Sequence, residues 1–443
     1  MRRFGYTLLM HLAIPLILLR LWMRGRTESG YRKHIGERFG GISGIGGIGG
    51  NDQDGVSSRL PVNSIWLHAV SVGEVRAAVP LIAALRTQWP DAPVVLTCMT
   101  PTGRRTASDL FATGVTVCYL PYDLPWAISR FIRRWRPMML VIMETELWPN
   151  LLAACATSHV SAFLANARLS EKSYQGYAAY APLRALATQA FGQFHTVMAQ
   201  SEADAARLCA LGANKTVVTG NVKFDISVLP AFVARGAEWR APFMPSRRPV
   251  VLLASTREHE EVKLLDAFLR QFTDAAQHGP RPLLVVVPRH PTRFDDVASR
   301  IVAHGLSLVR RSQLTPPPAD IDVWLGDSMG ELQAYYAMCD LAIIGGSFQP
   351  LGGHNLIEAA ALGKPVLMGP SIFNFSDAVR LALEANAMIS VADADAAMAE
   401  AAKLFASPER LKQMGENALH FAQAHRGATA RTVEIIQNAL LQK

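Results

Sequence analysis

Asn355 and Glu358 are a pair of residues whose types and spacing suggest chemistry. They lie three positions apart at the expected start of a helix, so both side chains can face outward from its first turn. A glycine-rich loop, Ser347–Gly353, precedes them, and backbone N–H groups at such a loop and helix start can bind a phosphate. The carboxylate of Glu358 could accept hydrogen bonds from ribose hydroxyls. The pattern favours a nucleotide site, although an ordinary helix cap in an α/β domain produces the same pattern.

The flanks of this stretch predict how it is held. An apolar run, Leu341–Ile344, is typical of a buried strand, and a helix is expected from about His354–Asn355 to Gly363. A second short strand is expected at Val366–Met368. A strand, a glycine loop and a helix start in this order would aim backbone N–H groups at one point, where a phosphate can bind.

Carboxylates in the first half of the chain are candidates for acid–base chemistry. Glu74 ends the turn Ser71–Glu74, directly after an expected strand at Ile65–Ala69, and ligands of open α/β sheets bind at this end of the strands. Glu144 and Glu146 leave the end of another expected strand, where two carboxylates are costly unless they are used or solvated. For Glu74, capping of the following helix is the competing interpretation.

Basic and hydroxyl side chains occur at further strand ends. Lys223 lies in the segment Asn221–Asp225 that closes the first half, and it could reach a ligand between the halves. In the second half, three turns follow expected strands: Ala254–Arg257, Pro288–Pro291 and Leu325–Leu332. The guanidinium and hydroxyl groups there suit a phosphate. Because these turns and Gly352–Glu358 should converge on one sheet edge, a nucleotide site at that edge is favoured.

Two runs of alternating strands and helices must position these residues. The expected strands are short and apolar: Ile65–Ala69, Val94–Cys98, Val115–Cys118, Met138–Met143, Val160–Leu164, Thr196–Ala199, Val250–Ala254, Leu283–Val287, Asp322–Leu325, Leu341–Ile344 and Val366–Met368. Helices such as Glu74–Trp89 and Tyr174–Phe191 lie between them, and alanine-rich helices run from Asp395 to Leu441. This alternation predicts an α/β protein with parallel sheets covered on both faces, in two Rossmann-like halves separated by a cleft.

Length and composition agree with two globular cores. The chain has 443 residues, more than one ordinary domain, and 50% of them are hydrophobic, which excludes global disorder. The net charge of +8 favours an anionic partner, but no zinc-finger spacing, stacking-aromatic motif or dense basic run points to nucleic acid. The five cysteines occur singly, as expected of reduced thiols in a cytosolic domain. His259 and His290 lack metal-ligand spacing, so neither is expected to bind a metal.

Residues 4–23 are the only segment with membrane character. Their length is near the ~20 residues that span a bilayer, although His11, Pro15 and Arg20 weaken the apolar run. A basic flank follows: Arg20, Arg24, Arg26, Arg32, Lys33 and Arg38. This flank carries more positive charge than the residues before the segment, which predicts that the remainder of the chain is cytoplasmic. A spanning anchor and an interfacial helix both fit, and both imply membrane association.

Shifts in composition give the expected domain boundaries. The membrane anchor and its basic flank cover 1–39, and a glycine-rich linker covers 40–60. A first Rossmann-like domain should occupy 61–228, and a second should occupy 249–443. The segment 229–248, with its prolines and paired arginines, is the expected hinge.

Motifs along nearly the whole chain resemble those of the 3-deoxy-D-manno-octulosonic acid (Kdo) transferases. In order they are YRKHIGERFG, WLHAVSVGEV, METELWPN, NARLSEKS, GNVKFD, AST, PRHPTRF, GDSMGEL and GGSFQPLGGHNLIEAAALGKPVLMGP. METELWPN and the long glycine-loop motif are specific, whereas the strand–turn–helix motifs are common to many enzymes of the GT-B fold. The glycine tract after Phe39 departs from the family pattern, but it touches no motif.

The resemblance implies a GT-B fold, with two Rossmann-like domains facing a cleft and an N-terminal membrane-anchor helix. It also implies an inverting, metal-independent glycosyltransferase of lipopolysaccharide synthesis. Such an enzyme moves Kdo from CMP-Kdo to the acylated lipid A precursor, lipid IVA, on the cytoplasmic face of the bacterial inner membrane. CMP-Kdo is the donor substrate, and no cofactor is implied.

The resemblance also assigns roles to individual residues. Glu74 falls on the general base, and Glu144 and Lys223 fall on positions that stabilise the transition state. The family's contacts to CMP fall on Pro288, Arg289, Met329, Gly330, Glu331, Asn355, Leu356, Ile357 and Glu358. These roles agree with a carboxylate base in the first half and a nucleotide in the second.

Two other functions share many of these features. A GT-B enzyme that acts on a UDP-sugar, such as an N-acetylglucosaminyl transferase or an epimerase, has the same architecture. An epimerase has a soluble substrate, however, and the membrane segment argues against it. A catalytically inactive nucleotide-binding scaffold at the membrane is the third possibility, and the joint presence of Glu74, Glu144 and Lys223 argues against it. A nicotinamide dehydrogenase is poorly supported, because no GxGxxG follows the first strand.

Overall fold

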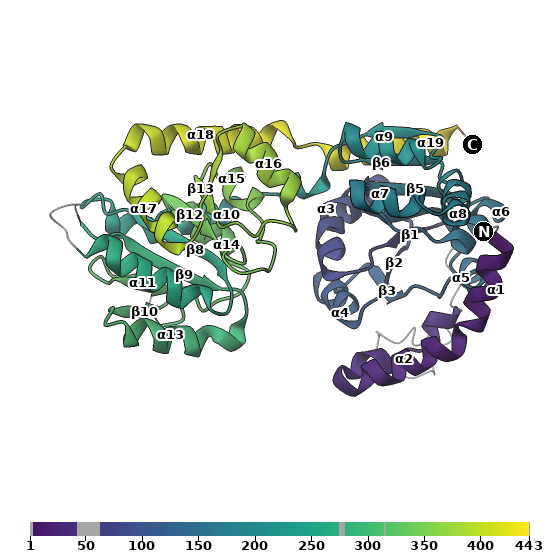
Figure 1. Ribbon diagram of the computed structural model, residues 1–443, viewed down its shortest axis with the longest axis horizontal. Helices are drawn as coiled ribbons and strands as arrows, with labels where there is room; N and C mark the ends of the chain where they lie inside the picture. Colours follow the sequence, from purple (N-terminus) through teal and green to yellow (C-terminus); the bar gives the residue numbers. More distant parts are fainter. Residues whose placement is uncertain (1–2, 42–62, 274–279, 314–315, 443) are drawn as a thin grey trace. The chain divides into compact units, whose positions relative to one another are not determined.

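The computed structural model describes residues 3–41, 63–273, 280–313 and 316–442. The chain divides into two compact units, Met1–Asp225 with Arg426–Lys443, and Ile226–His425. Each unit contains a seven-stranded parallel sheet packed between helices (Figure 1). The glycine-rich linker predicted at 40–60 lies outside the described residues, apart from Gly40 and Gly41.

The first sheet is parallel throughout. In sheet order its strands are β3 (Val115–Tyr119), β2 (Val94–Cys98), β1 (Ser64–His68), β4 (Pro137–Met143), β5 (Ser161–Ala167), β6 (Thr196–Ala199) and β7 (Thr216–Val218). The order reverses between β1 and β4, which lie side by side although β2 and β3 separate them in the chain. Ligands of such sheets bind outside the carboxyl ends of the strands at this reversal.

Side-chain alternation explains why this sheet is buried on both faces. In β1, Ile65 and Leu67 join one apolar cluster, and Trp66 between them joins the other. The residues of β1 are all buried, as expected for a strand covered by helices on both sides. Continuous apolar runs of this kind are what made the central strands recognisable in the sequence.

The second sheet has the same design. In sheet order its strands are β10 (Leu308–Arg310), β11 (Val323–Leu325), β9 (Leu283–Pro288), β8 (Val250–Thr256), β12 (Leu341–Ile344), β13 (Val366–Met368) and β14 (Met388–Ser390). Here the order reverses between β8 and β12. A ligand of this unit is therefore expected outside the carboxyl ends of β8 and β12.

The helices connect and cover these strands. Those of the first unit are α3 (Val72–Gln88), α4 (Pro101–Leu110), α5 (Pro125–Trp135), α6 (Pro149–Thr157), α7 (Glu171–Ala178), α8 (Ala181–Phe191), α9 (Glu202–Ala210), η3 (Val222–Phe224) and α19 (Ala428–Leu441). Those of the second are α10 (Pro230–Arg240), η4 (Ala241–Phe243), α11 (Glu260–Phe272), η5 (Pro291–Arg293), α13 (Phe294–Ala303), α14 (Leu332–Met338), α15 (Ile357–Ala361), α16 (Ser376–Glu384), α17 (Ala394–Phe405) and α18 (Pro408–Ala424).

The N-terminal segment forms two helices where the sequence predicted one. α1 (Arg3–Leu12) and α2 (Ile14–Thr27) meet at 50°, and Pro15 lies in the first turn of α2, just after the break at Ala13. No single described helix is long and apolar enough to cross a membrane, whereas this bent pair passes that test by length and composition. The pair exposes apolar side chains: Phe4, Leu8, Leu9, Leu12, Leu16, Leu18, Leu19, Trp22 and Met23.

The end of the N-terminal segment is part of the first unit's core. Two short helices, η1 (Ser29–Arg32) and η2 (Glu37–Phe39), follow α2. Arg38, which we had counted in the basic flank, is only 1% exposed, and its guanidinium lies 3.7 Å from the centre of the Tyr119 ring. The neighbouring Glu37 is also buried; its carboxylate accepts the N–H of Tyr119 at 3.0 Å and lies 3.3 Å from Arg104.

Several predicted boundaries differ from the structure. The predicted helix Tyr174–Phe191 is two helices, α7 and α8, because Pro182 restarts the helix after Tyr180. β7, β10 and β14 were not predicted. Each has three residues that are mostly not buried, so it lacks the buried apolar run by which the equally short β11 and β13 were recognised.

The division of the chain also differs from the prediction of 249–443 as one domain. Arg426–Lys443 belongs to the first unit, where Ile436 of α19 joins the same apolar cluster as Leu67. Asp225 holds the start of α19, because its carboxylate accepts the N–H groups of Gly427 and Thr429. The segment 229–248, expected to be a hinge, contains α10 and η4 and lies within the second unit.

Candidate active site

Glu74 lies in the first turn of α3, directly after β1. Ser71 is the residue before the helix, and Glu74 folds back over it. One carboxylate oxygen accepts the N–H of Val70 at 2.7 Å, and the other accepts the Ser71 hydroxyl at 3.1 Å. The carboxylate thus caps its own helix, as one interpretation of the sequence required. Capping also fixes its position at the carboxyl end of β1, beside the reversal of strand order.

Glu144 and Lys223 form an ion pair at the next strand end. Glu144 follows β4 with a left-handed backbone, φ 55°, which a non-glycine residue adopts only when its surroundings hold it there. Its N–H donates to the carbonyl of Ala165 on β5, and its carboxylate lies 3.1 Å from Lys223 Nζ. Lys223 is on η3, whose start is capped by the Asn221 side chain at 2.9 Å.

Glu146 is a third carboxylate in this group, and the sequence analysis gave it no catalytic role. Burial above all, together with the charges of Glu144 and Glu146, raises the pKa of Glu74 to about 7, although the hydrogen bonds from Val70 and Ser71 act in the opposite direction. Burial also raises the pKa of Glu146 to about 7, again with a contribution from Glu144. The three carboxylates are therefore close enough to interact. The spacing of two residues in METELWPN was the available signal for Glu146.

A carboxylate of this kind suits general-base catalysis. A base is most effective when its pKa lies near the working pH, because it is then both partly ionised and able to hold a proton. Glu74 meets this condition, whereas Lys223 offsets the charge of Glu144. The group therefore combines a proton acceptor with a fixed positive charge at the reversal between β1 and β4.

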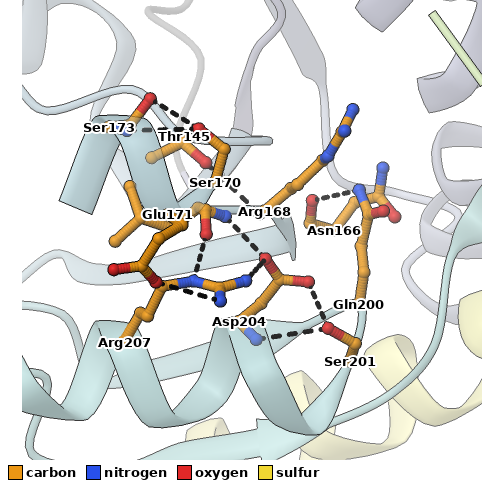
Figure 2. Close-up of polar contacts among 11 residues, drawn as sticks. Thr145, Asn166, Arg168, Ser170, Glu171, Ser173, Gln200, Ser201, Asp204 and Arg207 are labelled. Carbon is orange, nitrogen blue, oxygen red and sulfur yellow. Dashed lines mark hydrogen bonds and ion pairs between the residues drawn. The ribbon is translucent and has the colours of Figure 1, made fainter. Parts of the chain in front are cut away.

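A polar network supports the loop next to this group (Figure 2). The buried Asp204 on α9 accepts the N–H of Leu169 at 2.8 Å and the Ser201 hydroxyl at 2.5 Å, and it pairs with Arg207 at 3.3 Å. Thr145, between Glu144 and Glu146, accepts the N–H of Arg168 at 3.2 Å. The network thus ties the NARLSEKS loop to the METELWPN loop.

In the second unit, a buried carboxylate occupies the glycine loop. Glu260, at the start of α11 and 0% exposed, accepts the N–H groups of Gly346 at 2.8 Å, Phe348 at 2.9 Å and Arg257 at 2.8 Å. Our prediction that the loop's own N–H groups aim at a phosphate is therefore wrong for Gly346 and Phe348. Sequence reasoning missed Glu260, because its two partners in the glycine loop are 86 and 88 residues away.

Asn355 and Glu358 stand at the start of α15. The helix begins at Ile357, two residues later than predicted, because the Asn355 side chain caps it by accepting the Ile357 N–H at 3.0 Å. The Asn355 amide also donates to Glu358 at 3.2 Å, so the two polar side chains are adjacent, as predicted. The side chains of Leu356 and Ile357 are buried, so only the backbone of these two residues is suited to contact a ligand.

Pro288 and Arg289 lie at the end of β9. The Arg289 N–H donates to the carbonyl of Thr256 at 3.0 Å, which places this residue beside the end of β8. The Arg289 side chain is near Tyr336, because its charge lowers the raised pKa of that buried phenol. Arg289 is thus adjacent to the reversal between β8 and β12.

Met329, Gly330 and Glu331 precede α14. Met329 is 58% exposed, and Gly330 has a left-handed backbone, φ 81°, with open space where a side chain would be. The carboxylate of Glu331 instead binds Arg235 at 2.7 Å and Arg311 at 3.2 Å. Its charge is therefore neutralised within the unit, and the backbone of this segment is the part suited to a nucleotide.

No metal centre is evident in the described residues, 3–41, 63–273, 280–313 and 316–442. None of their histidine, cysteine, aspartate and glutamate side chains form a group of three or more that could hold an ion. Metal independence, which the resemblance implied, stays a prediction.

Comparisons with known proteins agree with this geometry. A family model described as 3-deoxy-D-manno-octulosonic-acid transferase (kdotransferase) matches residues 33–226, and one for glycosyl transferases group 1 matches residues 301–421. The solved glycosyltransferase of Rickettsia africae shares the fold with a TM-score of 0.55 at 15% identity, over 86% of this chain and 99% of its own. The UDP-GlcNAc 2-epimerase of Neisseria meningitidis, bound to UDP-GlcNAc, has a TM-score of 0.53 at 15% identity, over 86% and 100%.

Two parallel-sheet units of this kind, with a glycosyl transferase family match in each, define a glycosyltransferase of the GT-B fold. Relatives that match over their full length identify a family within this class of glycosyltransferases. The 3-deoxy-D-manno-octulosonic acid transferase of Bordetella pertussis is 41% identical over 99% of this chain and 100% of its own length. That of Haemophilus influenzae is 33% identical over 99% and 98%. The chain belongs to the 3-deoxy-D-manno-octulosonic acid transferase family.

Proposed function

We propose that this enzyme transfers Kdo from CMP-Kdo to the acylated lipid A precursor, lipid IVA, with inversion and without a metal. The observation that carries the proposal is the Glu74 carboxylate, which has a pKa near 7 and is fixed at the strand reversal beside the Glu144–Lys223 pair. Sequence identity to Kdo transferases over their full length supports Kdo as the sugar that is transferred. Donor, acceptor and stereochemistry are the parts of this proposal that need direct measurement.

The proposed reaction is a single displacement. Glu74 takes the proton from the acceptor hydroxyl as that oxygen forms a bond to the anomeric carbon of Kdo. The bond from this carbon to the CMP phosphate breaks, and its electron pair leaves with CMP. Attack opposite the leaving group inverts the anomeric carbon. The departing phosphate needs no proton once its charge is stabilised, and Arg289 in the second unit is the basic side chain proposed for that role.

Lys223 and Glu144 have a proposed supporting role. Three carboxylates in one place would repel an anionic donor, and Lys223 offsets the charge of Glu144 at 3.1 Å. The pair also holds Glu144 between β4 and η3, next to the proposed base. In this view the pair stabilises the charge that develops as CMP departs, in agreement with the roles that the resemblance implied.

The N-terminal helices are the proposed membrane contact. Exposed leucines, together with Phe4 and Trp22 on α1 and α2, provide apolar surface, and Arg24 and Arg26 are exposed beside them. An apolar surface flanked by exposed cations suits the boundary of an anionic leaflet. We therefore propose that the enzyme binds the cytoplasmic face of the bacterial inner membrane, where its acylated acceptor lies.

A panel of donors tests the function. The full-length enzyme, dispersed in detergent with lipid IVA, is supplied in turn with CMP-Kdo, UDP-N-acetylglucosamine and UDP-glucose, with and without EDTA. We expect product from CMP-Kdo only, at the same rate with EDTA, and an inverted linkage by NMR. Transfer from a UDP-sugar, or epimerisation of UDP-N-acetylglucosamine, would replace this proposal with the alternative GT-B function.

A further inference from the structure

Four basic side chains gather at the carboxyl ends of three neighbouring strands in the second unit. β9, β8 and β12 are adjacent in the sheet. Arg257 follows β8 directly, and Arg289 and His290 follow β9 directly. His354 is held at the end of β12, because its N–H donates at 3.1 Å to the carbonyl of the residue that follows the strand. The group therefore surrounds the reversal of strand order where a ligand of this unit is expected.

Two of these side chains lack protein partners. Among the described residues, no hydrogen bond or ion pair involves the Arg257 guanidinium, whereas the nearby Arg293 pairs with both Glu261 at 2.8 Å and Asp296 at 3.0 Å. The Nε2 atom of His354 is buried and has no hydrogen-bond partner in the described part of the chain. A buried polar atom without a partner is costly, so a ligand that supplies one is expected here.

Packing holds the His354 ring in place. A Cβ on Gly346 would lie only 3.1 Å from His354 Nε2, so the ring packs directly over this glycine. Gly346 itself is fixed by its bond to the buried Glu260. His354 Nε2 is thus positioned by a rigid loop, and its lack of a partner is not the result of a mobile side chain.

At neutral pH, the positive charge of these four basic side chains suits the binding of two anionic groups. Burial, and then the charges of Arg289, Arg257 and His290, lower the pKa of His354 to about 4. Burial, Arg257, Arg289 and Arg293 also lower the pKa of His290, with Glu258 opposing. Both histidines are therefore largely neutral at pH 7, and the positive charge comes from the two guanidiniums of Arg257 and Arg289. Like charges held together repel, which favours binding of anions between them.

We propose that Arg257 and His354 bind the carboxylate of the donor's sugar acid, while Arg289 serves the phosphate. This assignment rests on the proposed function. CMP-Kdo carries one phosphate charge and one sugar carboxylate, which equals the number of guanidiniums at the strand ends. Arg289 belongs to the segment assigned to CMP, and Arg257 remains for the second anion. Its planar fork can bind both oxygens of a carboxylate, and the neutral imidazole of His354 can donate from Nε2.

This arrangement would give the enzyme selectivity for a nucleotide of a sugar acid. A neutral sugar would leave Arg257 without an anion and His354 Nε2 without a partner. Sites that leave buried polar groups unpaired reject a ligand strongly. A UDP-sugar also carries two negative charges, but both are on its diphosphate. If Arg257 binds phosphate, its removal should weaken binding of CMP and of CMP-Kdo alike. If Arg257 binds the sugar carboxylate, its removal should weaken binding of CMP-Kdo only.

The test is calorimetry on the full-length enzyme with CMP and with fresh CMP-Kdo, in the absence of acceptor. Arg257→Ala should weaken CMP-Kdo binding by about 10- to 100-fold, the range for a charge-assisted hydrogen bond, and change CMP binding by less than about twofold. Arg257→Lys should recover part of the loss. Arg380→Ala, an exposed arginine on α16 paired with Glu384, is the matched control and should change neither.

Three outcomes would overturn the assignment. An equal loss for CMP and CMP-Kdo would make Arg257 a phosphate ligand. Unchanged binding of both would remove Arg257 from the site. A wild-type chain that binds UDP-sugars but not CMP-Kdo would contradict the proposed function itself, and the carboxylate site with it.

Discussion

If Glu74 acts as the proposed base, stability and function make opposite demands on its side chain. Its pKa in the fold is about 7, above the value of about 4.3 for an exposed glutamate. Between these values the unfolded chain releases the proton first, so the contribution of Glu74 to stability falls as the pH rises toward 7. The fold therefore disfavours the ionised form that a general base requires. Such a cost is expected at a catalytic group, and it has no evident purpose in a helix cap alone.

The pH dependence of catalysis should report this pKa. The value of kcat/KM should fall as the pH drops through about 7, because Glu74 then holds a proton. Glu146→Gln removes a negative charge that raises the pKa of Glu74, so it should move this acidic limb to lower pH. The measurement is kcat/KM against pH for both proteins. An unchanged limb in the variant would show that Glu146 does not act on the group that titrates.

Glu358 is expected to bind the ribose of CMP. Its position beside Asn355 at the start of α15 leaves a carboxylate that two ribose hydroxyls can reach. Glu358→Ala should weaken CMP binding by roughly 1.5–3 kcal/mol, the range for a charge-assisted hydrogen bond. Glu384→Ala, an exposed glutamate on α16, is the control. Unchanged CMP affinity in calorimetry would remove Glu358 from the site.

The short helix η2 shows how an element predicted as a membrane flank became part of a core. Glu37 and Arg38 are buried against Tyr119 at the end of β3, so η2 links the N-terminal helices to the first unit. A buried carboxylate with a backbone N–H and an arginine as partners is costly to disturb. In the sequence, Arg38 was interpreted as the end of a basic flank, and Glu37 was given no role. Their burial depends on β3, about 80 residues later, and no local pattern reports it.

Glu37→Gln tests this link. The change keeps the shape but removes the charge that pairs with Arg104, so the free energy of unfolding should fall by about 1–3 kcal/mol. Glu28→Gln, in the same segment, should have little effect, because Glu28 forms no ion pair among the described residues. Denaturant unfolding of both variants gives the comparison. Equal stability of the two would mean that η2 contributes only surface contacts.

Removal of residues 1–23 should separate membrane binding from catalysis. The truncation removes the apolar surface but keeps the exposed Arg24, Arg26, Arg32 and Lys33, each worth about 1 kcal/mol near an anionic surface. The shortened enzyme should bind anionic vesicles weakly, and less so as salt rises, since screening acts within about 10 Å at 0.1 M. Turnover of detergent-dispersed acceptor should persist, although Asn150 loses the hydrogen bond that it accepts from Thr7 of α1 at 2.8 Å.

Vesicle flotation and an activity assay on the same preparation test whether the truncation separates membrane binding from catalysis. A truncated enzyme that ignores anionic vesicles at low salt would show that the basic side chains are only solvated surface. Loss of turnover in detergent would instead show that α1 supports the METELWPN loop, since Asn150 lies at its end.

The sequence predicted the architecture well and the details of the site less well. Central strands such as Leu341–Ile344 and Val94–Cys98 were predicted with correct ends, because continuous apolar runs leave no other interpretation. Glu74 and Glu144, two of the three carboxylates of the proposed catalytic group, were assigned roles in the sequence analysis and follow strands as predicted. That Glu74 and Glu144 share one site depends on the pairing of β1 with β4, and strand order is a tertiary property.

Long-range contacts explain what was missed. Glu260 fills the glycine loop from another helix, and α19 returns to the first unit through Asp225, about 200 residues earlier in the chain. Neither contact leaves a local pattern in the sequence. The same holds for the unpartnered Nε2 of His354, which only the packed structure reveals.

Single-turnover kinetics of Glu74→Gln test most directly whether this chain is a Kdo transferase that uses Glu74 as its base. The variant is mixed with saturating CMP-Kdo and lipid IVA, and its CMP affinity is measured in parallel. We expect the rate to fall by roughly two or more orders of magnitude while CMP binding is unchanged, because the proton acceptor is lost and the nucleotide site is in the other unit. Near-normal turnover by Glu74→Gln would contradict this role for Glu74.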